Sequence, residues 1–121
     1  MSDRDVKKIT NIEQLIRTVC HFRGTYAGLV PNRSTISKNE VRLWRAVFKP
    51  IEVAGQKFDH MCVPTNRRLY NAMNKASVGD IIEFTATVCA YKRGSRNLIG
   101  CKPNIRGIKN ITKDLIKTLI V

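Results

Sequence analysis

Apolar and polar residues alternate along the first half of the chain, which is the pattern of half-buried strands. The strands predicted there cover residues 19–30, 41–53 and 57–63. Gly24 and Gly28 mark points where the first strand bends, and Pro50 breaks the second. Residues 54–56, with the sequence Ala-Gly-Gln, supply a turn, so the second and third strands are expected to form a hairpin.

Helical spacing of apolar residues appears in three short segments before, between and after the strands. A capping box at Thr10 and Glu13 predicts about two helical turns before the first strand. Thr65 and Thr112 are the expected caps of the other two helices. Those helices are predicted over residues 66–75, with Leu69, Ala72 and Met73 inward, and over residues 113–119.

The clearest strand is predicted over residues 81–91, after a tight turn at residues 77–80 that Asp80 closes. Its apolar face consists of alternate residues, Ile82, Phe84, Ala86, Val88 and Ala90. A fifth strand is expected in one or two pieces over residues 98–111, with bends at a proline and a glycine.

The order of these elements resembles that of the OB-fold, in which three strands, a helix and two more strands follow one another. Residues 78–86, Val-Gly-Asp-Ile-Ile-Glu-Phe-Thr-Ala, also resemble the GD-x-I-x-F-x-A entry to the fourth strand of many nucleic-acid-binding OB proteins. The resemblance covers about residues 19–111 and implies a mainly β, five-stranded Greek-key barrel. A helix between strands 3 and 4 and short terminal helices complete the expected fold. Residues 10–121 are expected to form this single OB-like domain after a loose N-terminus at residues 1–9. A resemblance to the small replication accessory proteins of mobile genetic elements rests on no residue motif.

Length and composition narrow the class of protein. At 121 residues the chain is expected to fold as one domain with a hydrophobic core. Its hydrophobic share of 43% argues against a fully disordered or fibrous protein. The longest apolar run is far below the roughly 20 residues of a membrane span, and the first residues lack the apolar stretch of a secretory signal. A cytoplasmic protein without membrane association is therefore expected.

The charge balance is the unusual feature of the composition. The chain has 22 Lys and Arg residues against nine Asp and Glu, a formal net charge of +13. Such an excess on a small domain is typical of proteins that bind a polyanion. Nucleic acid is the leading candidate, and an anionic membrane or an acidic protein surface is the alternative. No acid lies between Glu83 and Asp114, although seven cations do, so phosphates are the natural counter-charge there.

Both loops that an OB-fold places beside its nucleic-acid groove are basic here, namely residues 31–40 and residues 92–97. The resemblance implies that these loops and the adjoining strands contact a single strand, while composition alone implies only a polyanion. The candidate nucleic-acid-binding residues are Arg33, Lys38, Arg42, Trp44, Tyr91, Lys92, Arg93, Arg96, Lys102 and Arg106.

Aromatic side chains are the second requirement, because single-strand binders stack bases on them. The expected platforms are Trp44 on the second strand and Tyr91 at the end of the fourth, beside the basic loop. Trp44 is equally consistent with a core anchor, since tryptophan is mostly buried in proteins. The core is expected to take Phe22, Phe58 and Phe84.

No pattern of residues points to catalysis or to a metal site. The four cysteines are at least 12 residues apart and lack the close pairs of structural zinc sites, so they are interpreted as small buried hydrophobic residues. Asp59 and His60 are adjacent, and neighbours on a strand point to opposite faces. The sequence thus predicts a protein that is not an enzyme and that needs no cofactor or metal.

Three hypotheses about function remain. The first is a non-catalytic module that binds single-stranded DNA or RNA, as an accessory to a replication, repair or recombination enzyme such as a polymerase or helicase. The second is a protein-interaction subunit or inhibitor whose basic face docks on an acidic partner or on a nucleic-acid enzyme. The apolar residues at 115–121 would favour the second if their helix docks on a partner, although a helix that plugs the end of the barrel is the simpler interpretation. The third, binding of double-stranded DNA or structured RNA, has no recognition-helix motif to support it.

Overall fold

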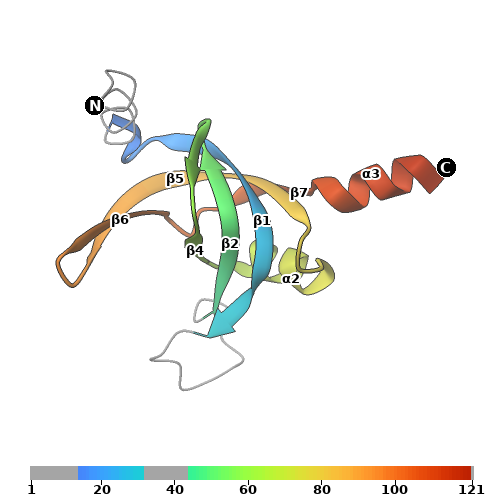
Figure 1. Ribbon diagram of the computed structural model, residues 1–121, viewed down its shortest axis with the longest axis horizontal. Coiled ribbons are helices and arrows are strands. Elements are labelled where there is room, and N and C mark those ends of the chain that lie inside the picture. Colours follow the sequence, from blue (N-terminus) through green and yellow to red (C-terminus); the bar gives the residue numbers. More distant parts are fainter. Residues whose placement is uncertain (1–13, 32–43, 121) are drawn as a thin grey trace.

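The computed structural model describes residues 14–31 and 44–120, apart from the side chains of residues 92, 93, 96, 97 and 120 (Figure 1). Most of the predicted N-terminal helix and the predicted loop at residues 32–40 lie outside this part of the chain. The elements within it are β1 (Val19–Pro31), β2 (Trp44–Val53), β3 (Gln56–Phe58), β4 (Met61–Pro64), α2 (Arg67–Lys75), β5 (Ile81–Arg93), β6 (Arg96–Cys101), β7 (Arg106–Asn110) and α3 (Ile111–Ile120).

The strands form one antiparallel sheet that curls into a half-barrel (Figure 1). Its hydrogen-bonded order is β3-β2-β1-β5-β6, with β4 continuing β3 along one edge of β2 and β7 continuing β6 along one edge of β5. The described strands therefore occupy five positions in the sheet, and the mainly β class is confirmed. This curled sheet is compatible with an OB-like barrel. Among the described residues no ladder joins β4 to β6, so the barrel has an open seam there.

The hairpin made by β2 with β3 and β4 keeps one continuous register. Ala54 and Gly55 form its tip, both at positive φ (49° and 83°), as a tight two-residue hairpin turn requires. The sequence predicted that β2 would break at Pro50 and that its partner would be one strand over residues 57–63. Both predictions are wrong, because β2 runs through Pro50 and the partner breaks at residues 59–60 instead. The register places this break opposite Pro50, which has no N–H to donate to the ladder.

The core lies where three phenylalanines meet between β1, β2 and β5. The rings of Phe22 and Phe84 are stacked with their centroids 5.0 Å apart, and the Phe48 ring lies 5.7 Å from Phe84. Gly24 allows this close approach of β1 to β2, because a Cβ at that position would lie 2.9 Å from the Phe48 Cβ and 3.0 Å from the Ile51 Cγ1. The bend predicted at Gly24 is thus also a packing requirement.

Helix α2 seals the core from one side with Leu69 and Met73, both fully buried as predicted. Its N-cap is Asn66, whose side-chain oxygen accepts a hydrogen bond from the Leu69 N–H at 2.8 Å. The prediction of Thr65 as the cap is wrong. Thr65 is buried, and its hydroxyl donates to the Trp44 carbonyl at 2.9 Å, which ties the start of α2 to β2.

The fifth predicted strand is present as two pieces, β6 and β7. The inward face predicted for β5 is confirmed from Ile82 to Val88 but not at Ala90, which is exposed. Beyond Val88 the strand leaves the barrel, and the β5–β6 hairpin projects past the other strands (Figure 1).

The first turn of α3 is fixed to the turn before β5. Asn110 caps the helix by accepting from the Lys113 N–H at 3.0 Å, and its amide group donates to the Asp80 carboxylate at 2.9 Å. Thr112, the predicted cap, instead accepts from the Ile81 N–H at 2.9 Å. These bonds anchor the base of α3 to the barrel.

The rest of α3 projects away from the sheet (Figure 1). Three of its apolar side chains are exposed, Leu115 by 59%, Ile116 by 48% and Leu119 by 84%. The interpretation of this helix as a plug for the barrel is therefore wrong for the residues that the structure describes.

Candidate nucleic-acid interface

A groove of about 200 Å³ lies over the open seam of the barrel. One wall comes from β2 and β4, which contribute Arg45, Cys62 and Pro64. The facing wall comes from the β5–β6 hairpin and the end of β6, with Cys89, Tyr91, Gly100 and Cys101. The seam groove, as we call it, therefore forms only because the curled sheet brings its two edge strands together.

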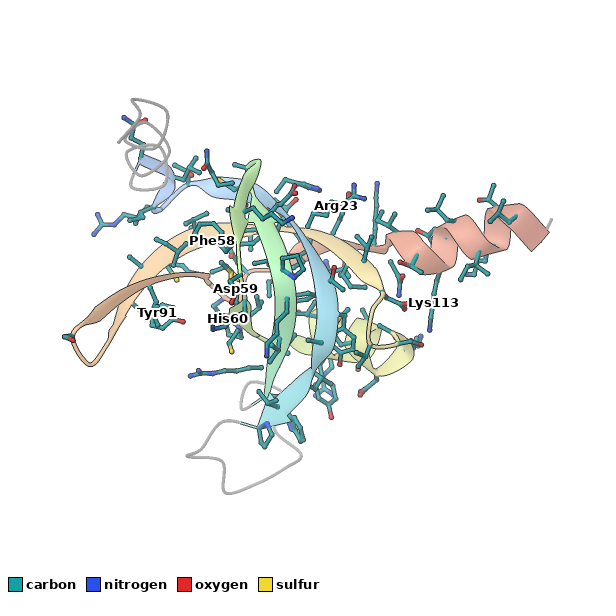
Figure 2. The ribbon with its side chains drawn as sticks, in the orientation of Figure 1. Arg23, Phe58, Asp59, His60, Tyr91 and Lys113 are labelled. Carbon is teal, nitrogen blue, oxygen red and sulfur yellow. The ribbon has the colours of Figure 1, made fainter. Side chains whose placement is uncertain are left out.

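Tyr91 gives the seam groove an exposed aromatic surface. Gly100 lies against one edge of its ring, since a Cβ on Gly100 would be 3.0 Å from the Tyr91 Cε1 and 3.5 Å from the Cδ1, with no other ring atom within 4 Å. The side chain is 39% exposed, which confirms the expectation that it does not lie in the core. The ring therefore contacts the strand through one edge and remains accessible from outside (Figure 2).

The charge of the seam groove is positive. Arg45 is its charged lining residue, and no carboxylate is among the described residues that line it. Burial raises the pKa of the Cys89 thiol, and the nearby Lys102 ammonium only partly opposes that shift. Burial, with a smaller effect of Cys89, raises the pKa of the Cys101 thiol to about 12. Both thiols are thus neutral at pH 7 and leave the cations without an internal counter-charge.

Six of the predicted site residues cannot be placed beside the seam groove by their side chains, because those side chains lie outside the described part of the chain. Arg33, Lys38 and Arg42 lie outside the described residues. The backbone of Lys92, Arg93 and Arg96 forms the tip of the β5–β6 hairpin, with Arg93 paired to Arg96, while their side chains lie outside the described part.

Trp44 takes the position of an anchor. It shares the inward parity of β2 with Ala46 and Phe48, both fully buried. Its ring lies 6.1 Å from that of Tyr70 on α2, at an interplanar angle of 55°. Trp44 is half-buried between β2 and α2 and is not among the residues that line the seam groove, although its neighbour Arg45 is, and a stacking role for it stays a prediction.

Lys102 and Arg106 lie along the continuation of this edge of the sheet. Lys102 follows β6, and its N–H donates to the Thr87 carbonyl at 2.9 Å. Arg106 pairs with Thr85 on β5, six residues before Tyr91. At about 3.3 Å per residue, Arg106 is roughly 20 Å from Tyr91 along the strand. Only Lys102 of the two is close to the seam groove.

Arg45 is a charged residue of the seam groove that the sequence did not single out. It occupies the outward parity of β2 and pairs with Pro64 on β4. The signal was present, because an arginine that alternates with Trp44 and Ala46 must point away from the core. Its partners across the seam come from residues more than 40 positions later, so their proximity needed the fold.

In two other clusters the ionisable side chains pair with one another. Glu83 accepts from Arg23 at 3.2 Å and lies 3.3 Å from the His21 Nε2. The expectation that Asp59 and His60 point apart is wrong, because they lie in the break between strands and their side chains are 3.4 Å from each other (Figure 2). Both are largely exposed, so the pair has no enclosed site in which to act.

The part of the chain that the structure describes contains no group of three metal-ligating side chains. None of its helices has the length and apolar character needed to cross a membrane. A scan against models of protein families and a search of curated proteins found no match to this chain.

Proposed function

We propose that this protein is a non-catalytic module that binds single-stranded nucleic acid across the seam of an OB-type barrel. The observation that carries the proposal is the exposed Tyr91 ring, whose edge packs against Gly100, in a groove that also has Arg45 and no carboxylate among the described residues that line it. A flat aromatic surface stacks any base, and cations beside it bind the adjacent phosphates. The groove lies beside the basic β5–β6 hairpin, which offers further cations to a bound strand.

The biological setting is a further part of the proposal. A binding module of this size, with a net charge of +13, suits an accessory role beside a replication, repair or recombination enzyme such as a polymerase or helicase. In that setting it holds the single strand while the partner performs the chemistry.

The test is fluorescence anisotropy with labelled single-stranded and double-stranded DNA of equal length, each at 50 and 200 mM salt. We expect tighter binding of the single strand, because only unpaired bases can stack on Tyr91. Equal affinity for both forms that vanishes at 200 mM salt would contradict the proposal, since it would show attraction to a polycation alone.

The β5–β6 hairpin supplies a second test. Arg93→Glu combined with Arg96→Glu is expected to weaken single-strand binding strongly, since it replaces two cations at the tip of the hairpin by anions. Lys57→Glu combined with Lys117→Glu is the matched control, because it makes the same change of charge on β3 and α3. Equal losses in the two double variants would argue against this site.

A second candidate function rests on α3. Its exposed apolar side chains and the adjacent Lys117 suit a partner protein with an apolar groove bordered by a carboxylate. Deletion of residues 115–121 should leave the barrel folded, because the described apolar side chains of that segment make no part of the core. Loss of binding to the partner enzyme with single-strand affinity retained would assign α3 to docking.

A further inference from the structure

A second groove, separate from the seam, lies between α2 and β7 and has a volume of about 470 Å³. Its helical wall consists of Arg68, Asn71, Ala72 and Lys75, which follow the spacing of one helix face. Gly107 and Ile108 of β7 form the other wall. Two cations at the two ends of this face, with an amide between them, make a row of donors along the α2–β7 groove.

The cations of the α2–β7 groove have no carboxylate to pair with among the described residues. Helix α2 contains three basic residues and no acid, and β7 contains two basic residues and no acid. Of the acids on neighbouring elements, Asp80 and Glu83 are engaged with other groups, whereas Asp114 on α3 is exposed. Asp80 accepts from Asn110 and from the Ser77 N–H, and Glu83 contacts His21 and Arg23. A concave surface lined by charges of one sign concentrates the electric field, so a positively charged groove attracts a polyanion.

Hydrogen bonds hold both ends of the α2–β7 groove in place. At the start of α2 the Asn66 amide donates to the Pro103 carbonyl at 2.9 Å and to the Ile105 carbonyl at 2.8 Å, which fixes the helix to the connection before β7. At its end the Lys113 ammonium donates to the Lys75 carbonyl, and Figure 2 shows Lys113 at the base of α3. The walls are therefore preformed, so a ligand does not have to order them.

A single strand can connect the seam groove to the α2–β7 groove. Lys102 and Arg106 lie between them along the edge of the sheet, and Arg106 is roughly 20 Å from Tyr91 at about 3.3 Å per strand residue. At roughly 3.4 Å per phosphate in a stacked strand, that distance corresponds to about six nucleotides. This is within the roughly 4 to 16 nucleotides that one OB-type domain covers.

We propose that the α2–β7 groove is a second phosphate-binding site for the same single strand that occupies the seam groove. The inference rests on the proposed function and extends it. Strands long enough to pass Arg106 engage Arg68 and Lys75 through their phosphates, whereas short strands bind at Tyr91 alone.

The experiment compares the oligonucleotides dT5 and dT15 with the double variant Arg68→Glu and Lys75→Glu. For dT15 we expect at least a tenfold loss of affinity at 50 mM salt. The slope of log affinity against log salt should become shallower by about 1.4, since each lost phosphate contact contributes about 0.7 for a single strand. For dT5 the loss should not exceed that of the control Lys57→Glu with Lys117→Glu. Arg68→Gln with Lys75→Gln, which removes the charges at similar side-chain length, replaces the test variant if the latter does not fold.

The outcomes separate this inference from the proposed function. The α2–β7 groove is not a phosphate site if the Arg68→Glu and Lys75→Glu variant loses affinity equally for dT15 and dT5, or loses none for either. The seam groove stands in that case if Tyr91→Ala still weakens the binding of both oligonucleotides. If the unaltered protein binds neither oligonucleotide, the proposed function and the inference both fail.

Discussion

Replacement of Tyr91 by alanine tests the central feature of the seam groove. The ring contacts the strand at Gly100 through one edge and is 39% exposed, so a base can stack on it. One stacked base contributes about 1–3 kcal/mol, which corresponds to a roughly 5- to 150-fold loss of affinity at 25 °C. Tyr91→Phe keeps the ring and should bind within about twofold of the unaltered protein, while Tyr91→Leu keeps apolar bulk and should lose affinity as alanine does.

Gly100→Ala perturbs the same ring without removing it. The new Cβ would lie 3.0 Å from the Tyr91 Cε1, so the ring has to shift by a few tenths of an ångström. We expect a smaller loss of affinity than in Tyr91→Ala, and no additional loss when the two substitutions are combined, because both act through one ring. Anisotropy titrations of labelled dT15 with the three variants and the combination measure these effects. Tyr91→Ala within twofold of the unaltered protein, in a variant that unfolds at the same urea concentration, would refute the reasoning.

Three further predictions concern the scaffold. Gly24→Ala places a Cβ within 3.0 Å of two fully buried side chains and should destabilise the fold by about 1–3 kcal/mol through overpacking, seen as a lower urea midpoint in Trp44 fluorescence. Hydrogen bonds from the Asn110 side chain and the Ser77 N–H lower the pKa of Asp80 in the folded protein. The ionised carboxylate therefore stabilises the fold above the ordinary aspartate pKa of about 3.9. This stabilisation is lost as the pH falls through the lowered pKa of the folded state. Thermal melts between pH 2 and 7 should therefore show a weaker acid dependence in Asp80→Asn, and equal dependence in both proteins would contradict this. Asn66→Ala should cost about 0.5–2 kcal/mol through the lost cap alone, and an unchanged melting temperature would count against the capping geometry.

Local patterns in the sequence were sufficient for much of the fold. Alternation located β1 and β5 almost to the residue, because one face of each is buried along most of its length. The N-cap of α2 was harder to predict from the sequence, since Thr65 and Asn66 are both good capping residues. Only the burial of Thr65 in the structure decides between them. The effect of Pro50 also needed the structure, because it falls on the partner strand and not on β2.

The candidate site was only partly predictable for a similar reason. Tyr91 stood out because it ends a clear strand beside a basic loop. Arg45 and Gly100 did not, since their significance comes from the seam, where strands far apart in the sequence meet. The α2–β7 groove likewise depends on contacts of Asn66 with residues 103 and 105, which no local pattern encodes.

The anchored base of α3 has a mechanical consequence. Bonds to Asp80 and Ile81 orient the first turn, and the ten residues of the helix extend about 15 Å at 1.5 Å per residue. A protein bound to the far end of this helix would sit at a set distance and angle from the barrel. The helix would then act as a rigid spacer, transmitting the orientation of the barrel and of any strand it carries to that protein.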